Sequence, residues 1–408
     1  MVSTLPTEII HLIIETLRTA LEEHTLASCS LVCQSWRSFV QPLLFQHVRL
    51  CVTKPLDEFL AFLKASPHLA AAIRVLNIWA NIHPTTMVID AESGKCRLSP
   101  VLLLQVAANL PLSAELQLQG ITLIGWPDDI PLPTTPAKLH KLKPHFLTFR
   151  PFAHSQCISY DLFSFFELDE LDVADSHTDE FINPAAALAV ALPAETRSIA
   201  RSLEIIGVDA FVMRNLLYGG LHPDHLATVR FFPTDGESLG LAGLILRTQG
   251  AGVLNIELCI SHIINFEGPQ DATFWDVFSM SSCTRLETLN LSCRHLIPRV
   301  QETQGLDGVC AAYLATLASV TPRTLAALIF DLPHTNSAEA LSCVMRHFVP
   351  PIEQAVARFP GLRTLTLVAL VTRSLTAEPL RCMNAMRGTL PARIMDGGML
   401  RFEYKDVD

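Results

Sequence analysis

Charged residues are scarce in this chain, and hydrophobic residues are abundant. Asp, Glu, Lys and Arg make up 17% of the 408 residues, whereas hydrophobic residues make up 50%. Intrinsic disorder requires the opposite balance, because a chain that buries little apolar surface cannot offset the entropy lost on ordering. Nearly all of the sequence is therefore expected to be packed.

Long apolar runs are also missing. The longest stretch without a charged residue, residues 98–114, contains two prolines and several polar residues. A membrane-spanning helix needs about 20 predominantly apolar residues, so this stretch is expected to form a buried helix followed by a turn. The first residues lack a basic segment and a small-residue cleavage site, so we expect no secretory signal.

The cysteines do not form the pattern of a disulfide framework. There are eleven of them, an odd number, scattered along a long chain. This distribution is typical of reduced thiols, and we expect a cytoplasmic or nuclear location, or both.

The net charge of −10 argues against broad binding to nucleic acid or to anionic membranes. One local exception is KLHKLKPHFLTFR, residues 138–150, where basic residues alternate with phenylalanines. An RNA-binding patch is one interpretation of this segment. The interpretation that we prefer is a solvated connection leading into a buried strand.

Motifs for catalysis or metal binding are weak or missing. Cys29 and Cys33, with His24 nearby, have the residue types of a zinc site, but no second pair follows at the usual spacing. We expect both cysteines on the apolar face of a helix, as buried thiols. The sequence has no G-x-S-x-G motif and no P-loop. We therefore expect no enzyme activity, no cofactor and no metal. Two further candidate metal-ligand pairs are equally isolated: His222 with His225, and Cys259 with His262.

The first fifty residues carry a dense helical pattern. In LPTEIIHLIIETL, residues 5–17, Pro6 and Glu8 suit the first turn of a helix. Apolar residues then recur at spacings of three and four, which predicts an amphipathic helix of about three turns. The residues of its apolar stripe are Ile10, Ile13, Ile14, Leu17 and Leu21.

A second helix is predicted after an N-cap at Thr25. Pro42 is expected to end it, PLLF to begin a short third turn, and His47–Leu50 to start a strand. Three short helices in fewer than fifty residues cannot bury a self-sufficient core, so this module should gain stability from a partner, from the rest of the chain, or from both. The residues expected on one side of the second helix are Cys29, Val32, Cys33, Trp36, Phe39 and Val40.

These residues resemble the F-box, in the form common in mushroom-forming fungi. The resemblance implies binding to the Skp-family adaptor of a Skp–cullin–F-box ubiquitin ligase, and through it to a cullin. Trp36 and Val32 could instead belong to the core of the module. Three blocks carry the resemblance: Leu5-Pro6-x-Glu8-Ile9, Cys29-Ser30-Leu31-Val32-Cys33-x-Ser35-Trp36-Arg37, and Leu43-Leu44-Phe45 with Val48-Arg49-Leu50. The adaptor contacts that it implies are Leu5, Pro6, Ile9, Leu31, Val32, Trp36, Leu43 and Leu44.

Beyond residue 55 a second pattern recurs, in which apolar residues occupy the first, fourth and sixth positions. Successive copies lie about 32 residues apart on average, which exceeds the usual leucine-rich-repeat period of about 20–29 residues. Longer helices or inserted loops are therefore needed. The copies are Ile73–Leu76–Ile78, a weaker Leu116–Leu118, a marginal Pro144–Leu147–Phe149, Leu168–Leu171–Val173, Ala200–Leu203–Ile205, Leu226–Val229–Phe231, Val253–Ile256–Leu258, Leu286–Leu289–Leu291, Leu325–Leu328–Phe330 and Leu362–Leu365–Leu367.

Helical segments fall between these strands, which argues for an α/β fold with a parallel sheet. The predicted architecture is a three-helix F-box module, residues 1–50, followed by an irregular leucine-rich-repeat-like solenoid, residues 51–394. A hairpin cap and tail, residues 395–408, is predicted from the turn Asp396-Gly397-Gly398. The expected helices cover residues 56–66, 100–110, 185–200, 308–319 and 351–359.

The resemblance makes the chain a candidate substrate-recognition subunit that binds an unknown protein target. A ligase-independent scaffold, or a protein that binds only the adaptor, is the alternative. Lysine is rare, with 7 residues against 23 arginines and none between Lys143 and Lys405. Genome composition is the simpler explanation, although few acceptor amines would also suit a protein that works beside ubiquitin-transfer enzymes.

Overall fold

In the computed structural model the chain forms two compact units. Unit 1 comprises residues 1–172 and 176–198, and unit 2 comprises residues 173–175 and 199–408. The residues that the structure describes are 7–19, 23–51, 56–80, 97–112, 114–124, 135–150, 163, 165–178, 199–208, 210–216, 221, 225–261, 263–264, 272–293, 303–321, 323–335, 337–371, 379–395 and 398–406.

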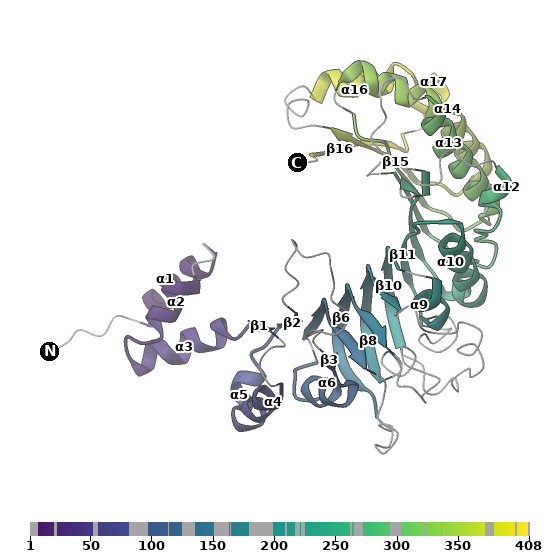
Figure 1. Cartoon of the computed structure of the whole chain (residues 1–408). Coiled ribbons are helices and arrows are strands. Elements are labelled where there is room, and N and C mark those ends of the chain that lie inside the picture. The colour runs from purple at the N-terminus through teal and green to yellow at the C-terminus, as the bar shows by residue number, and fades with distance from the viewer. Residues whose placement is uncertain are drawn as a thin grey trace. The chain divides into compact units, whose positions relative to one another are not determined.

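A helical module opens unit 1 (Figure 1). It contains α1 (Thr7–Thr19), α2 (Glu23–Cys29) and α3 (Gln34–Leu44). The predicted apolar stripe of the first helix is confirmed at Ile10 and Ile14, which are buried against Leu26 and Val40. This small core holds the three helices together, because burial of an aliphatic side chain stabilises by roughly 1.5–3 kcal/mol.

The prediction of one long second helix is wrong. Thr25 lies inside α2 rather than at its N-cap, and α3 starts after a turn, with Cys33 as its N-cap residue. The Ser30 hydroxyl donates to the carbonyl of Ala27 over 2.6 Å, which favours a turn over a continued helix. Val32 and Cys33 consequently leave the apolar face and are exposed.

The prediction that Pro42 ends the helix is wrong. α3 continues through it to Leu44, so PLLF belongs to the end of this helix instead of forming a separate turn. Pro42 has no N–H to donate to the carbonyl of residue 38, so α3 continues with one intrahelical hydrogen bond fewer. The predicted strand at His47–Leu50 is confirmed as β1 (His47–Cys51).

The main sheet of unit 1 is built from β1, β2 (Val75–Trp79), β4 (Glu115–Gln119), β6 (Ala137–His145) and β8 (Phe166–Ala174), in that order. The pairs from β1 to β6 are parallel and in register. β1 thus joins the sheet by pairing with β2. The predicted boundary between the F-box module and the solenoid, at residue 50, falls inside β1. Buried side chains at equivalent positions of adjacent strands form the core columns: Leu76, Leu116 and Leu142, and Ile78, Leu118 and Pro144.

Two of the predicted helices lie in unit 1. The segment 56–66 forms α4 (Leu56–Ala65), followed by α5 (Pro67–Ala70), and the segment 100–110 forms α6 (Pro100–Ala107). Leu103 and Val106 of α6 are fully buried, as expected for the uncharged stretch 98–114. The predicted helix at 185–200 lies outside the described residues up to 198, and Ile199 begins a strand.

Short strands that follow the main strands form a second parallel sheet in unit 1. They are β3 (Arg97–Leu98), β5 (Thr122–Ile124), β7 (Thr148–Arg150) and β9 (His177–Thr178). Between β4 and β5 the chain turns at Gly120, with φ +67°, and between β6 and β7 it turns at Phe146, with φ +52°.

The marginal repeat copy Pro144–Leu147–Phe149 is wrong in register. Leu142 and Pro144 occupy the positions of Leu116 and Leu118, so this copy begins at Leu139. Leu147 is buried, but it lies beyond the turn at Phe146, where the direction of the chain changes.

Unit 2 contains β10 (Ile199–Ile206), β11 (Thr228–Phe232), β12 (Asn255–Cys259), β13 (Thr288–Ser292), β14 (Ala327–Asp331), β15 (Thr364–Val371) and β16 (Leu400–Asp406), all parallel and in this order. The repeat copies predicted here are confirmed as buried strands, since their apolar residues form two in-register columns: Leu203, Val229, Ile256, Leu289, Leu328 and Leu365, and Ile205, Phe231, Leu258, Leu291, Phe330 and Leu367.

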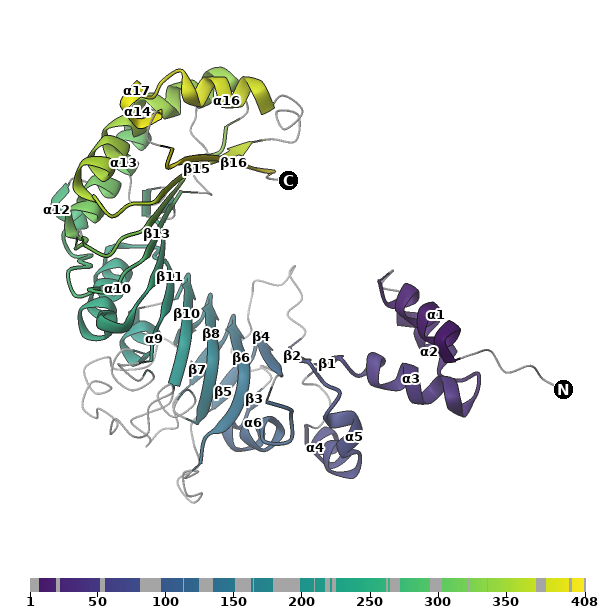
Figure 2. The same cartoon turned by 180° about the vertical axis from the view of Figure 1, so that it is seen from behind.

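Helices cover one face of these strands (Figures 1 and 2). They include α9 (Ala210–Asn215), α10 (Gly236–Gln249), α12 (Ala272–Trp275), α13 (Thr303–Ser319), α14 (Ala338–Arg358) and α16 (Pro379–Arg387). Asp235 and Ser238 form a capping box at the start of α10, and Gly250 follows the last residue of this helix, just before β12.

One prediction for unit 2 is confirmed but too short, and another is wrong. The helix expected at 351–359 begins at Ala338 and runs through Pro350 and Pro351. The expected C-terminal hairpin is not formed, because Ala392–Met395 makes the short helix α17 and β16 pairs with β15 in parallel. Ile394 is buried, and a single helical turn achieves this as well as an alternating strand would.

No helix in the described ranges has the length and apolar character needed to cross a membrane.

Candidate partner-binding surfaces

The helical module exposes apolar side chains that its core does not use. Ile9 is 42% exposed, Leu31 76% and Val32 66%. Leu12, which the sequence analysis missed, is 65% exposed. Ile9 and Leu12 lie three residues apart on α1, outside the stripe of Ile10 and Ile14, and this second apolar row is the signal that could have revealed Leu12.

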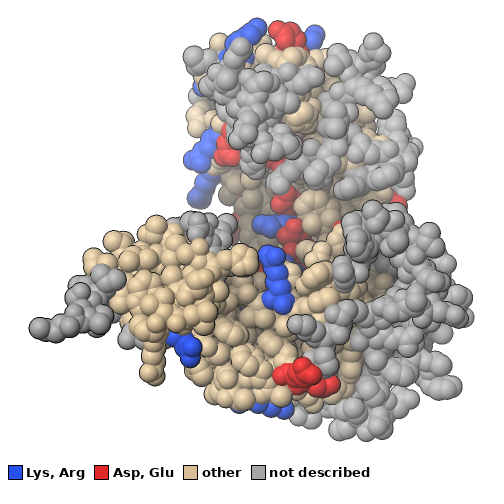
Figure 3. Space-filling model, turned by 60° about the vertical axis from the view of Figure 1, so that its left-hand side comes forward, with Lys and Arg blue, Asp and Glu red and all other residues tan. Residues whose placement is uncertain are grey.

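The predicted adaptor contacts thus fall into different environments. Ile9, Leu31 and Val32 are exposed, so Val32 does not belong to the core of the module. Leu5 and Pro6 lie outside the described residues. The other three contacts are half-buried against the Ile10–Ile14–Leu26–Val40 core: Trp36, Leu43 and Leu44. On the face in view, the lobe formed by α1–α3 is largely uncharged (Figure 3).

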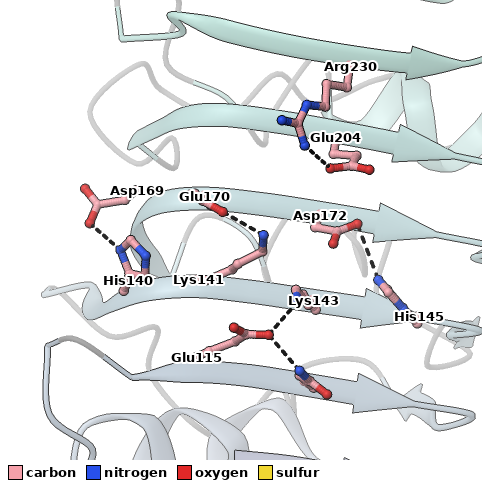
Figure 4. Close-up of polar contacts among 11 residues, drawn as sticks. Glu115, His140, Lys141, Lys143, His145, Asp169, Glu170, Asp172, Glu204 and Arg230 are labelled. Carbon is pink, nitrogen blue, oxygen red and sulfur yellow. Dashed lines mark hydrogen bonds and ion pairs between the residues drawn. The ribbon is translucent and has the colours of Figure 1, made fainter. Parts of the chain in front are cut away.

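The basic segment 138–150 forms β6 and β7. The prediction of a solvated connection at this segment is therefore wrong. The basic side chains of the segment pair with carboxylates of the neighbouring strands (Figure 4). Lys141 Nζ lies 2.6 Å from Glu170 Oε2 and Lys143 Nζ lies 2.6 Å from Glu115 Oε1. The ion-pair ladder of unit 1 also contains Lys138 with Glu167 at 2.8 Å, His140 with Asp169 at 2.9 Å and His145 with Asp172 at 3.3 Å.

Charge in the ladder is almost balanced but slightly acidic. Three lysines face five carboxylates, which leaves a formal charge of −2 when the two histidines are neutral. The carboxylates hold the lysines that an RNA-binding surface would need, so the RNA interpretation loses its support. Nucleic acid binding requires an excess of free positive charge.

Partners shift the pKa values of two half-buried charged groups of the ladder, Glu115 and Lys141. Burial alone would raise the pKa of Glu115, but hydrogen bonds from Lys143 and Gln117 outweigh it and lower this pKa. Burial alone would lower the pKa of Lys141, but its hydrogen bond with Glu170 raises this pKa instead. Both groups are therefore held in their charged forms.

Reversing one charge of the ladder should destabilise unit 1. Lys141→Glu places like charges opposite each other on β6 and β8 and should cost roughly 1–2 kcal/mol of unfolding free energy. The exchange Lys141→Glu with Glu170→Lys should recover at least half of that loss. Denaturant unfolding of the single and double variants measures both. Lys138→Glu, on a more exposed pair, is the control and should cost less; a double variant no more stable than Lys141→Glu would contradict a direct interaction.

Side chains of the types that bind metals do not gather in the described part of the chain. No group of three or more His, Cys, Asp or Glu side chains there could hold a metal ion. Cys29 packs against the core of the module and Cys33 is exposed, so the expectation of two buried thiols holds only for Cys29 in part. His225 is exposed and Cys259 buried, whereas His222 and His262 lie outside the described residues.

Two buried cysteines of unit 2 are poor nucleophiles. Burial raises the pKa of Cys283 to about 12, and burial raises that of Cys310 to about 12 as well. The thiolate is the reactive form, and these groups remain protonated at neutral pH. All cysteines in the described ranges are free thiols.

Comparison with protein families finds a match for the helical module. A family model described as F-box-like matches residues 2–51, which include α1, α2, α3 and β1. The chain therefore carries an F-box-like domain, about an eighth of its length. Comparison with curated proteins found no match.

Proposed function

We propose that the chain is the substrate-recognition subunit of a Skp–cullin–F-box ubiquitin ligase. The match of residues 2–51 to the F-box-like model supports this proposal, since F-box domains generally bind Skp-family adaptors. The exposure of Ile9, Leu31 and Val32 gives it a physical basis, because these side chains gain apolar contact when a partner covers them.

The proposal assigns adaptor binding to the exposed residues of the module and target binding to the rest of the chain. Trp36, Leu43 and Leu44 pack against the core of the module and are partly buried. In the proposal they support the docking surface, and their exposed atoms contact the adaptor. Leu5 and Pro6 remain predicted contacts. The domain would have the fungal form that its sequence most resembles.

We further propose that the repeat copies are diverged leucine-rich repeats stacked as a solenoid. One buried strand per copy and apolar columns in register support this. The proposed role is binding rather than catalysis, in the cytoplasm, the nucleus or both.

Affinity capture from cell extract tests the proposal. The full chain should co-purify with a Skp-family adaptor and with a cullin. A complex that contains the adaptor without a cullin would favour a ligase-independent scaffold or an adaptor-only protein. Absence of the adaptor from the captured complex would contradict both. Capture with ligase activity blocked, followed by mass spectrometry, should then identify the target.

A further inference from the structure

Phe146 occupies a backbone conformation that a phenylalanine rarely adopts. Its φ of +52° lies in the left-handed region, which is unfavourable for a bulky L-residue. At the equivalent turn one strand earlier the chain uses glycine, Gly120, with φ +67°. Glycine enters this region without steric cost, so Phe146 stands where the fold itself would favour glycine.

The turn is fixed by its neighbours and leaves Phe146 outside. The Gly120 N–H donates to the carbonyl of His145 over 3.1 Å, and the Thr148 N–H donates to that of Ile121 over 3.0 Å. Leu147, the next residue, is fully buried. Phe146 itself is 48% exposed, and Gly120 beside it has no side chain that could cover the ring.

An aromatic residue held at a conformational cost, with half of its surface in water, is not explained by the stability of the fold. Strained residues that persist in native structures often serve binding or catalysis. Rigid, exposed aromatic side chains are typical anchors of protein–protein interfaces. Phe146 directly follows His145, the last residue of the ion-pair ladder on β6.

The ladder indicates the chemistry of the partner. Its formal charge is −2, and its lysines are already bound to carboxylates. The exposed carboxylates retain free acceptor sites, whereas the ammonium groups are engaged; Glu167, Asp169 and Glu170 have side chains 37%, 69% and 39% exposed. Such a surface complements a cationic group, and an arginine can also stack on an aromatic ring.

We propose that Phe146 and the ion-pair ladder of unit 1 form a docking surface for an arginine-bearing segment of a partner protein. One guanidinium would stack on the Phe146 ring, and further arginines of the segment would donate hydrogen bonds to the exposed ladder carboxylates. This inference rests on the proposed function, because it names the class of target that the receptor would recognise.

The test uses the full chain and a short fluorescent peptide in which arginine alternates with glycine. Fluorescence anisotropy at low salt should show binding that is weaker for the matching lysine peptide and undetectable for the glutamate peptide. Phe146→Gly should weaken binding of the arginine peptide by about tenfold. The same substitution should leave the melting temperature unchanged or raise it, because glycine relieves the left-handed strain.

Two further variants complete the design. Phe146→Asn also tolerates the left-handed conformation and should lose peptide affinity in the same way. Leu112→Ala removes another exposed apolar side chain of unit 1, one that is 68% exposed, and should leave affinity unchanged.

Several results would overturn the proposal: no binding of the arginine peptide, unchanged affinity in Phe146→Gly, a lowered melting temperature in both Phe146 variants, or a preference for a single-stranded RNA oligonucleotide. Adaptor capture is measured on the same preparations and should be unaffected by Phe146→Gly. Loss of adaptor capture by the unaltered chain would count against the proposed function alone.

Discussion

Substitution of Leu31 and Val32 by aspartate should abolish capture of the Skp-family adaptor. Both side chains are exposed, at 76% and 66%, so a partner must bury them to gain from their apolar surface. Two charges placed in such an interface lose apolar contact and remain without a partner when buried. Loss of two central anchors typically costs at least about 4 kcal/mol, or roughly a thousandfold in affinity. Titration of the purified adaptor measures this loss.

The same variant should unfold like the unaltered chain. Exposed side chains outside the core change stability by about 0.5 kcal/mol or less. Leu112→Asp, which charges an equally exposed position elsewhere in unit 1, is the matched control and should keep full adaptor affinity. Unchanged adaptor binding by the Leu31→Asp/Val32→Asp variant would show that the turn between α2 and α3 is not part of the interface.

The largest effect on stability is expected at Gly243. A Cβ atom there would lie 2.3 Å from the carbonyl oxygen of Val277 and 3.1 Å from the Cα atom of Phe278. Both are backbone atoms, so the clash can be relieved only by moving α10 or the segment it packs against. Gly243→Ala should therefore lower the unfolding free energy by roughly 2–3 kcal/mol. Denaturant unfolding with intrinsic fluorescence would measure it.

The same helix provides the control. A Cβ atom at Gly240 would meet no heavy atom within 4 Å. Gly240→Ala should stabilise unit 2 by up to about 1 kcal/mol, because alanine favours the helix and restricts the unfolded chain. If both variants have the same stability, the close approach of α10 to Val277 does not exist in solution.

The strands could be predicted from the sequence because their burial is periodic. In unit 2 the fourth and sixth positions of the copies form core columns, as Leu289 and Leu291 illustrate. The pattern failed at 144–149 because a left-handed turn at Phe146 changed the direction of the chain. Residue propensities do not predict this turn, since phenylalanine rarely adopts the left-handed conformation.

The ends of the helices in the helical module were harder to predict. The apolar periodicity continues from Cys29 to Val40, and only the serines near Ser30 indicate that the helix ends. A turn at residues 30–33 exposes Leu31 and Val32 instead of burying them. The functional assignment of these two residues therefore needed the structure.

The ion-pair ladder was present in the sequence but could not be recognised. Basic residues at 138, 140 and 141 have acidic counterparts 29 residues later, at 167, 169 and 170. This offset has meaning only when β6 and β8 are known to be neighbours. Without that pairing, the basic segment suggested either an RNA-binding patch or a solvated connection.

Hydrogen–deuterium exchange of the full chain, with and without a purified Skp-family adaptor, tests most directly whether the exposed apolar residues of the module form a docking surface. Addition of the adaptor should slow amide exchange in α1 and in residues 30–33, and should leave β6 and β8 unchanged. Exchange that stays the same in α1 and residues 30–33 when the adaptor is bound, or protection confined to other segments, would contradict the assignment.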